Sequence, residues 1–365
     1  MNFDSILIAN RGEIACRVMQ TAQNMGIKCI AVYVDADSDA PFVKMADEAV
    51  RLSSTYMDGD AIISAAKQTS AQAVHPGYGF LSENAAFARK VRNNKLIWIG
   101  PSPHVIKVMG DKLKAKELAE KSGVPTLPMT TDIKDAKKLG YPLLIKAAAG
   151  GGGKGMRVVA SPKDLKESIV SAKREALSGF GDDRIFIERY VEKSRHIEIQ
   201  ILGDEHGNIV HLGERECSIQ RRHQKIIEES PSSRVDPFLR EQMGEAAIKL
   251  AKKIKYFSAG TVEFLMDDKT GEFWFLEVNT RLQVEHPVTE EVTGIDLVYE
   301  QIKIARGDEL EFTQDDISWH GHAIEARLYA EDPGNNFLPE VGTLIAYDTE
   351  TVSYTHLTLP TIYSV

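Results

Sequence analysis

The sequence is poor in cysteine, in long apolar runs and in net positive charge. Its three cysteines, Cys16, Cys29 and Cys217, form no C-x-x-C pair, which excludes a disulfide scaffold, a zinc ribbon and thioredoxin chemistry. No apolar run approaches the ~18 residues that span a membrane, and the first residues lack the features of a signal peptide. With 44 Lys+Arg against 53 Asp+Glu, the formal charge is −9 at pH 7, which argues against nucleic acid or membrane partners. We therefore expect a cytoplasmic protein.

What the sequence does contain is an alternation of apolar strands and amphipathic helices over its first hundred residues. A helix with one apolar face is predicted over residues 13–25. Short apolar strands are predicted at residues 6–9, 29–34, 73–74 and 96–99. Strands of this kind, separated by helices, predict a parallel sheet covered on both faces. A length of 365 residues is enough for two or three domains.

The second region, from about residue 111, begins with a predicted helix over residues 111–122. Ser161 as a cap and Pro162 at the first helical position predict that another helix begins there. Strands are predicted at residues 142–146, 156–159, 185–187 and 197–201, and a hairpin at 261–279. From about residue 352 no helical or strand periodicity continues, and we interpret residues 351–365 as a foreign tail on a truncated reading frame.

A glycine tract at residues 150–155 lies between two of these strands. It matches G-x-G-x-x-G, but a dinucleotide-binding fingerprint needs a helix to follow, and here a strand follows. A Walker P-loop is excluded because Lys154 is followed by Gly155. A hairpin loop of glycines can place its backbone N–H groups over phosphates, and Lys146 would add a positive charge. The alternative is a plain flexible hairpin loop.

The predicted hairpin at 261–279 carries a candidate metal site. Glu277 and Asn279 lie two residues apart on one strand, hence on one face, and Glu263 lies on the other strand. Two carboxylates and an amide oxygen converging there would repel unless a cation lay between them, and such hard ligands suit Mg²⁺. The alternative is a solvated hairpin face with scattered acids.

Two further stretches contain candidate anion-binding groups. In residues 280–287, Arg281 can fork onto a small planar oxyanion and Glu285 could accept a proton from it; an ordinary salt-bridged loop is the alternative, and His286 is interpreted as structural. Residues 214–225 contain four cations, which suggests an anion site, the alternative being a solvated basic face. His320 and His322 lack a third metal ligand and are interpreted as part of a surface strand.

Taken together, several motifs resemble biotin carboxylase, the ATP-grasp component of biotin-dependent acyl-CoA carboxylases. The resemblance runs from residue 3 to about 347, and its motifs lie at residues 10–15, 75–84, 109–112, 150–155, 220–225 and 279–289. It implies a fold of the α/β and α+β classes, with a Rossmann-like domain at residues 1–111 and an ATP-grasp domain at 112–317. It also implies a mobile lid at about 128–190 and the beginning of a truncated C-terminal domain at 318–350.

The resemblance implies ATP- and bicarbonate-dependent carboxylation of biotin through carboxyphosphate. The implied cofactors are ATP and Mg²⁺ or Mn²⁺, with biotin as a carrier-bound substrate. The implied partners are a biotin carboxyl carrier, a carboxyltransferase and, for the full-length chain, a second copy. The chain contains no Met-Lys-Met biotin-attachment motif, so carrier and carboxyltransferase are expected elsewhere. The acyl-CoA that is finally carboxylated cannot be read from this sequence.

Carried over residue by residue, the resemblance implies a full set of site residues. Those for ATP are Lys112 and Lys146 at the phosphates, Gly152 and Gly153 in the lid, Glu188, Arg189, Tyr190 and Val191 around the adenine, and His196, Gln220 and His223 near the ribose. Those for the metal are Glu263, Glu277 and Asn279. Those for bicarbonate and biotin are Lys225, Arg281, Gln283 and Val284 as bicarbonate ligands, Glu285 as the base and Arg327 at the biotin enolate.

Two other functions remain open from the sequence. Another bicarbonate-activating ATP-grasp ligase, of the carbamoyl-phosphate synthetase kind, shares the first chemical step, although residues 220–225 and 281–285 favour biotin. A non-catalytic nucleotide-binding or dimerisation fragment is the second alternative. ATP turnover separates an enzyme from such a fragment, whereas a bound nucleotide alone does not.

Overall fold

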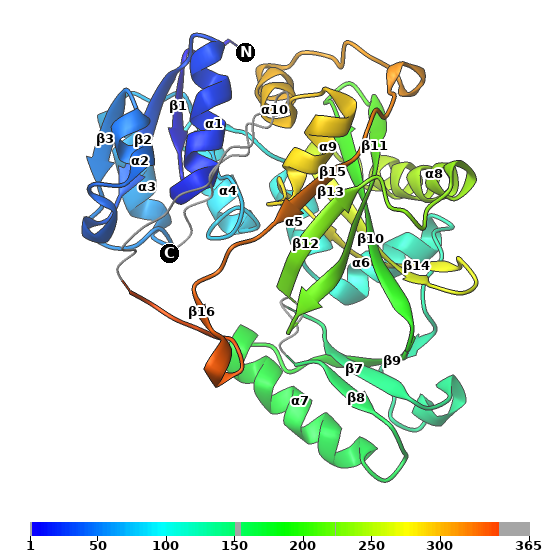
Figure 1. Cartoon of the computed structure of the whole chain (residues 1–365). Coiled ribbons are helices and arrows are strands. Elements are labelled where there is room, and N and C mark those ends of the chain that lie inside the picture. Colours follow the sequence, from blue (N-terminus) through cyan, green and yellow to red (C-terminus); the bar gives the residue numbers. More distant parts are fainter. Residues whose placement is uncertain (1, 150–154, 223, 343–365) are drawn as a thin grey trace.

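The computed structural model describes residues 2–149, 155–222 and 224–342 (Figure 1). Its first sheet is parallel, with the order β3-β2-β1-β4-β5. The strands are β1 (Ser5–Ile8), β2 (Lys28–Tyr33), β3 (Glu48–Arg51), β4 (Ala73–His75) and β5 (Ile97–Trp98). The helices around them are α1 (Gly12–Asn24), α2 (Pro41–Met45), α3 (Gly59–Gln68), α4 (Ala85–Asn93) and α5 (Pro103–Met109).

The apolar strands of this sheet are buried on both faces. Ile6 and Ile8 share a cluster with Val18 of α1, whereas Leu7 between them packs with Ile62 of α3. Successive side chains of a strand point to opposite faces, so a continuous apolar run serves both layers of helices. The predicted parallel sheet is confirmed.

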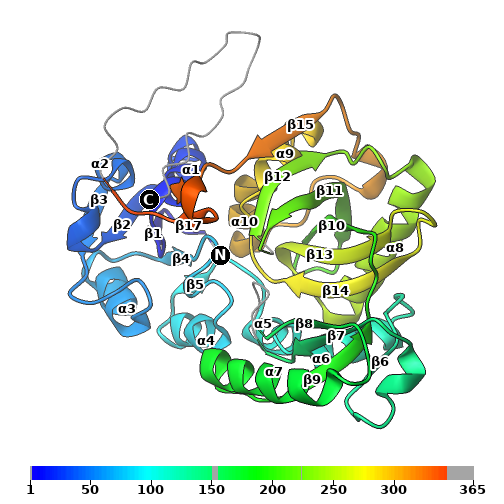
Figure 2. The ribbon, with the colours of Figure 1, turned by 60° about the horizontal axis from the view of Figure 1, so that its bottom comes forward.

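A second, larger sheet is antiparallel and has the strand order β14-β13-β10-β11-β12-β15. Its strands are β10 (Ser194–Gly203), β11 (Ile209–Arg221), β12 (Gln224–Ser230), β13 (Ser258–Asp267), β14 (Phe273–Asn279) and β15 (Ala323–Ala326). Figure 2 shows α8 (Pro237–Ile254) beside this sheet, where Met243 and Leu250 pack against Ile197 and Ile199 of β10. The predicted hairpin at 261–279 is confirmed as β13 and β14.

Three further helices pack against the large sheet, namely α6 (Lys112–Lys121), α9 (His286–Thr293) and α10 (Leu297–Arg306). Leu202 on its other face joins one apolar cluster with Leu297 and Ile302 of α10 and with Val18 of α1, so α10 links the two sheets. Ala115 and Ala119 pack with Phe275 of β14.

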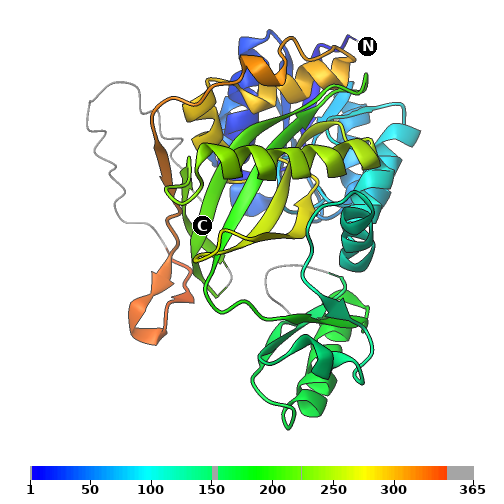
Figure 3. The same ribbon diagram turned by 90° about the vertical axis from the view of Figure 1, so that its right-hand side faces the viewer.

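A third, small sheet lies apart from the large one, as Figure 3 shows at the bottom of the view. Its order is β6-β9-β7-β8, and Ile169 of the helix that covers it packs on Leu143 and Ile187. Its elements are β6 (Met129–Thr130), β7 (Leu143–Ala147), β8 (Arg157–Val159), α7 (Leu165–Phe180) and β9 (Ile185–Arg189). The last described strands are the paired β16 (Glu331–Asp332) and β17 (Leu338–Pro339).

The structure corrects the predicted start of one helix, and two predicted features lie mostly or wholly outside the described residues. α7 begins at Leu165 rather than at Pro162, because residues 161–164 form a turn in which the Ser161 hydroxyl donates to the Asp164 carboxylate at 2.8 Å instead of capping a helix. Most of the glycine tract and the tail at 351–365 lie outside the described residues. Among the residues that are described, no helix is both long and apolar enough to cross a membrane.

Candidate functional site

A cavity of about 630 Å³ lies where the large sheet, the small sheet and α6 meet. It brings together nearly all the site residues that the sequence predicts. Those that line it are Lys112, Lys146, Glu188, Arg189, Tyr190, Val191, His196, Gln220, Lys225, Glu263, Glu277, Asn279, Arg281, Gln283, Val284, Glu285 and Arg327. The remaining three, Gly152, Gly153 and His223, lie outside the described residues.

Sequence reasoning missed other residues of this cavity. Tyr78 and Gly79, from the loop after β4, line it, and so does Lys116 of α6. Lys116 lies four residues after Lys112, and residues four apart lie on the same face of a helix. The spacing alone therefore predicts that Lys116 lies beside Lys112. Glu198 is a fully buried acid that pairs with Lys225 of the cavity. It lies two residues after His196 on β10, hence on the same face of the strand, and this spacing is the corresponding signal for it.

Lys225 lies at the centre of the charged groups in this cavity. Its ammonium nitrogen is 2.6 Å from Glu198 Oε2, 3.0 Å from Glu263 Oε1 and 2.6 Å from Glu285 Oε1. Burial lowers the pKa of Lys225, but the three carboxylates raise it by more, and the pKa ends well above its ordinary value. Lys225 therefore stays charged and holds side chains from β10, β13 and the start of α9 together.

Glu285, the predicted base, is fully buried and has both carboxylate oxygens engaged. Oε1 binds Lys225, and Oε2 is 2.9 Å from the Arg327 guanidinium. Burial raises the pKa of Glu285, but Lys225, Arg327 and Arg215 lower it by more, so its pKa falls below 4.5. The group is ionised near neutral pH, and each of its oxygens is paired with a cation.

The hairpin acids face each other as the sequence predicts. Glu263 of β13 is directly opposite Glu277 of β14, and the Asn279 amide donates to Glu263 Oε1 at 2.8 Å. The expected repulsion is balanced by the protein's own cations, since Glu277 lies 3.2 Å from Lys112 and Glu263 pairs with Lys225. Two carboxylates and an amide on one hairpin face are a donor set that fits Mg²⁺.

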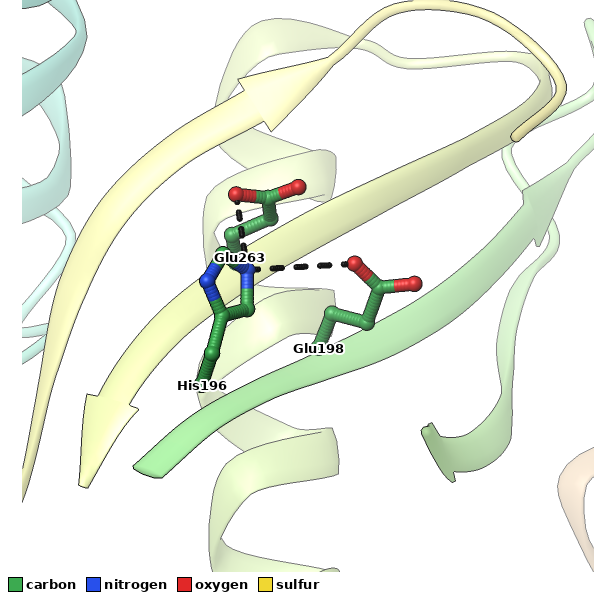
Figure 4. Close-up of side chains that lie close together, drawn as sticks. All are labelled: His196, Glu198 and Glu263. Carbon is green, nitrogen blue, oxygen red and sulfur yellow. Dashed lines mark ion pairs between the residues drawn. The ribbon is translucent and has the colours of Figure 1, made fainter. Parts of the chain in front are cut away.

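His196 points between two of these acids, as Figure 4 shows. Its Nε2 atom is 2.9 Å from Glu263 Oε2 and 4.0 Å from Glu198 Oε2. Burial lowers the pKa of His196, but Glu263 and Glu198 raise it by more, so that the pKa lies above its ordinary value. Glu263 and Glu198 thus favour the protonated form of this imidazole.

Arg281 connects the loop after β4 with the end of the hairpin. Its Nε donates to Glu83 Oε2 at 3.0 Å and its Nη1 donates to Gln283 Oε1 at 2.6 Å. Gln283 in turn donates to Glu263 Oε1 at 3.3 Å. The guanidinium is thus held in one orientation, which is what recognition of a small planar anion requires.

The expectation of one anion site formed by the four cations of residues 214–225 is wrong. Of these four, Lys225 lines the cavity. Arg215 lies fully buried beneath it and donates to Glu198 Oε1 at 2.6 Å. Arg221 pairs with Glu331, and Arg222 donates to the backbone oxygen of Asn336. The strands β11 and β12 form a hairpin here, so residues adjacent in sequence point to different surroundings.

A pair of buried acids lies behind Arg327. Glu325 of β15 is directly opposite Glu228 of β12, and Arg327 Nε donates to Glu228 Oε1 at 2.6 Å. Both oxygens of Glu325 are buried without a hydrogen-bond partner among the described residues. Burial, with Glu228 and Glu285, raises the pKa of Glu325 to about 8, against the lowering effect of Arg327 and Arg215.

This pair predicts a pH-dependent stability. Between its ordinary pKa of 4.5 and about 8, Glu325 holds a proton in the folded state and not in the unfolded state, so stability falls as the pH rises through that window. The Glu325→Gln variant has an uncharged side chain at every pH. We expect its free energy of unfolding to exceed that of wild type by about 1–3 kcal/mol at pH 8 and to be nearly equal to that of wild type at pH 4.5. Thermal unfolding at both pH values measures this, with Glu272→Gln in the exposed turn before β14 as the control. An equal difference at both pH values would contradict it.

The comparisons with known proteins agree with this geometry. Residues 2–106 match the family described as the biotin carboxylase N-terminal domain, and residues 111–313 match the carbamoyl-phosphate synthase L chain ATP-binding domain. The chain is 51% identical to a biotin carboxylase of Nostoc sp., over 95% of this chain and 80% of that protein. It is 53% identical to a propionyl-CoA carboxylase alpha chain of Ruegeria pomeroyi, over 94% of this chain and 52% of that one. The chain thus spans about half the length of the carboxylase alpha chains it matches.

Solved structures are similar over nearly the whole chain. A biotin carboxylase of Campylobacter jejuni, in a complex named as one with beta-gamma-ATP, matches with a TM-score of 0.89 and 48% identity, over 93% of this chain and 78% of that one. The biotin carboxylase domain dimer of the Hydrogenobacter thermophilus 2-oxoglutarate carboxylase, with MgADP and bicarbonate, matches with a TM-score of 0.90 and 46% identity, over 93% and 77%.

Proposed function

Because this chain belongs to the biotin carboxylase family, we propose that it catalyses the ATP- and bicarbonate-dependent carboxylation of biotin carried by a partner protein or domain. One observation carries the proposal. Glu285, the proposed base, lies between Lys225 and Arg327 in the same cavity as Arg281, the hairpin acids and the lysines of the proposed ATP site. A nucleotide, a bicarbonate and a biotin ring all need groups of these kinds within reach of one another.

For the nucleotide, we propose that Lys112 and Lys146 bind phosphate oxygens. Residues 188–191, at the end of β9, contact the adenine, and His196, Gln220 and His223 contact the ribose and its neighbours. Gly152 and Gly153 belong to a lid at about 128–190, which includes the small sheet. Lid closure excludes water from the phosphoryl group that is transferred. The domain boundaries at 1–111, 112–317 and 318–350 are proposed on the same resemblance.

For the metal, we propose that Glu263, Glu277 and Asn279 hold Mg²⁺ or Mn²⁺. When bound, the metal supplies positive charge against the phosphate oxygens. Glu277 is the most accessible of the three, with 30% of its side chain exposed, and Lys112 neutralises it in the absence of a metal. The lysine and the hairpin thus bind the same end of the nucleotide from two sides.

For the chemical steps, we propose that Lys225, Arg281, Gln283 and Val284 place bicarbonate against the γ-phosphate. Glu285 takes the proton of bicarbonate as its oxygen attacks phosphorus, and ADP leaves. The carboxyphosphate decomposes to phosphate and CO₂, the released phosphate takes the ureido N–H proton of biotin, and the nitrogen of the resulting biotin enolate bonds to CO₂. Arg327, already 2.9 Å from Glu285 Oε2, stabilises the negative charge on the biotin enolate.

The proposed partners are a biotin carboxyl carrier, a carboxyltransferase and a second copy of the chain. The dimer has a precedent in the domain dimer of the Hydrogenobacter thermophilus enzyme. A cytoplasmic location stays a prediction, since several related alpha chains, such as that of Mus musculus, are named mitochondrial. The acyl-CoA that receives the carboxyl group is set by the carboxyltransferase and is not assigned.

The proposal is tested by ATP hydrolysis with and without bicarbonate and free biotin. We expect turnover that requires both bicarbonate and Mg²⁺ and that rises with biotin. Turnover that needs ammonia in place of biotin would instead support a carbamoyl-phosphate synthetase-like ligase. Absence of ATP turnover while nucleotide still binds would support a non-catalytic fragment.

Glu277→Gln tests the metal assignment. We expect turnover to fall by about 10²-fold at low Mg²⁺ and to recover partly as Mg²⁺ increases, because one charged ligand is lost. Thermal stability should change by less than about 0.5 kcal/mol, since the Glu277–Lys112 pair is partly exposed. Glu272→Gln, on the exposed turn of the same hairpin, is the matched control. Unaltered turnover across the Mg²⁺ titration would remove Glu277 from the metal site.

A further inference from the structure

Two lysines share one buried carboxylate in the wall of the cavity. Glu188 of β9 is 3% exposed, its Oε1 atom pairs with Lys116 of α6, and its Oε2 atom lies 2.7 Å from Lys146 Nζ of β7. One carboxylate neutralises one ammonium. The group of three therefore has one positive charge in excess, inside a cavity that contains all three residues.

The two lysines are not equivalent. Lys116 is 3% exposed, and its ammonium lies 5.9 Å from the ring centroid of Phe186. The side chain of Lys146 is 13% exposed, and its strand leads into the glycine tract. Burial, and repulsion by Lys146, lower the pKa of Lys116 in spite of Glu188. Lys116 is thus the deeper lysine, and Lys146 is the one that faces the open space.

The pair of Lys116 and Glu188 also joins two parts of the molecule. Glu188 and Lys146 both belong to the small sheet, where β7 and β9 are hydrogen-bonded neighbours. Lys116 belongs to α6, whose apolar face packs against the large sheet. Lys116 can therefore remain paired with Glu188 whether or not Lys146 moves away from that carboxylate, because Lys116 does not belong to the small sheet.

We propose that Lys116 is a positioning residue that neutralises Glu188 permanently and so leaves Lys146 free to bind the nucleotide phosphates. This inference rests on the proposed function, because it takes ATP as the ligand. If Lys146 turned toward a phosphate without Lys116 in place, a buried carboxylate would be left with no cation, which is strongly unfavourable. With Lys116 present, Glu188 stays paired with a cation when Lys146 binds a phosphate. Nucleotide binding then does not leave a buried carboxylate uncompensated.

The proposal predicts a specific coupling between Lys116 and Glu188. In Lys116→Met, Lys146 is the remaining cation for Glu188, and we expect the dissociation constants of ATP and ADP to rise by ~10-fold or more. In a Glu188→Gln background the carboxylate is gone, and adding Lys116→Met should change those constants by less than about twofold. Lys116→Arg keeps the charge and should restore most of the affinity.

The experiment measures ATP and ADP binding to the whole chain by calorimetry, together with thermal unfolding of each variant. Lys114→Met, exposed on the same helix, is the matched control and should bind like wild type. Unchanged binding by Lys116→Met would overturn the proposal. An equal loss with and without Glu188→Gln would also overturn it, because Lys116 would then act on the nucleotide directly.

Two further comparisons cover a Lys116→Met variant that does not fold and a wild-type chain that binds no nucleotide. If Lys116→Met does not fold, Glu188→Gln is compared with the double variant, in which no buried carboxylate lacks its cation; equal affinities support the proposal and a large loss contradicts it. If the wild-type chain binds neither ATP nor ADP, the proposed function itself fails. If wild type binds and Lys116→Met binds equally well, this inference alone fails.

Discussion

Glu285→Gln is expected to lower bicarbonate-dependent ATP turnover by ~10²–10⁴-fold while leaving nucleotide binding unchanged. Glutamine keeps the size of the side chain and can still accept one hydrogen bond, but it cannot take a proton. In the structure both oxygens of Glu285 are held, by Lys225 and by Arg327, so the substitution also releases two cations. Steady-state turnover and calorimetric ADP binding, measured on the same preparations, separate the two effects.

The pH dependence of this variant follows from the charges around Glu285. Its pKa lies below 4.5, because the lowering by three cations exceeds the effect of burial. The base is ionised at all higher pH values, and its acidic limb in kcat/KM is expected below pH 4.5 rather than near neutrality. Above about pH 5.5 the profiles of wild type and Glu285→Gln should therefore have the same shape at very different heights.

Glu291→Gln, exposed on the same helix α9, is the matched control and should keep wild-type turnover. Wild-type turnover in Glu285→Gln would place the base elsewhere and leave Glu285 as a structural partner of Lys225 and Arg327. A limb near neutral pH in kcat/KM that disappears with Glu285 would contradict the low pKa of Glu285 in the free enzyme, whereas a limb in kcat alone would report the substrate complex.

Arg215→Met is expected to destabilise the fold by about 3–5 kcal/mol. Arg215 is fully buried and donates to Glu198 Oε1 at 2.6 Å, to Gln200 Oε1 at 2.6 Å and to Thr289 Oγ1 at 2.9 Å. Methionine fills much of the volume but donates nothing, so these acceptors lose their partner. Lys225 would be left to balance Glu198 together with two other carboxylates.

Thermal and denaturant unfolding of Arg215→Met measure this loss, which should lower Tm by about 6 °C or more. Arg174→Met, exposed on α7, is the control for loss of an arginine and should unfold like wild type. Glu198→Gln in the Arg215→Met background should recover part of the stability, because the uncompensated charge is removed. A Tm within about 2 °C of wild type would mean that water or a rearranged side chain replaces the guanidinium.

Many elements of the fold could be predicted because their signals are local. The apolar strands of the first sheet and the turn of the hairpin at 267–271 depend on residues within a few positions of one another. The prediction failed at Ser161 and Pro162, where a good capping sequence forms a turn and α7 begins at Leu165. A cap and a turn use the same side-chain hydrogen bonds, so the sequence pattern does not separate them.

The sequence by itself determined which chemical groups exist in this protein and on which face of its own strand or helix each one lies. Glu277 and Asn279 share a face because they are two residues apart on a strand, and this could be deduced without a structure. Only the tertiary structure decided which charges neutralise one another. Lys225 reaches carboxylates 27, 38 and 60 residues away in the chain, and Lys116 reaches Glu188, which is 72 residues away. Such partners are chosen by how sheets and helices pack, because a buried charge must find its counter-ion within a few ångströms in space, whatever their separation along the chain.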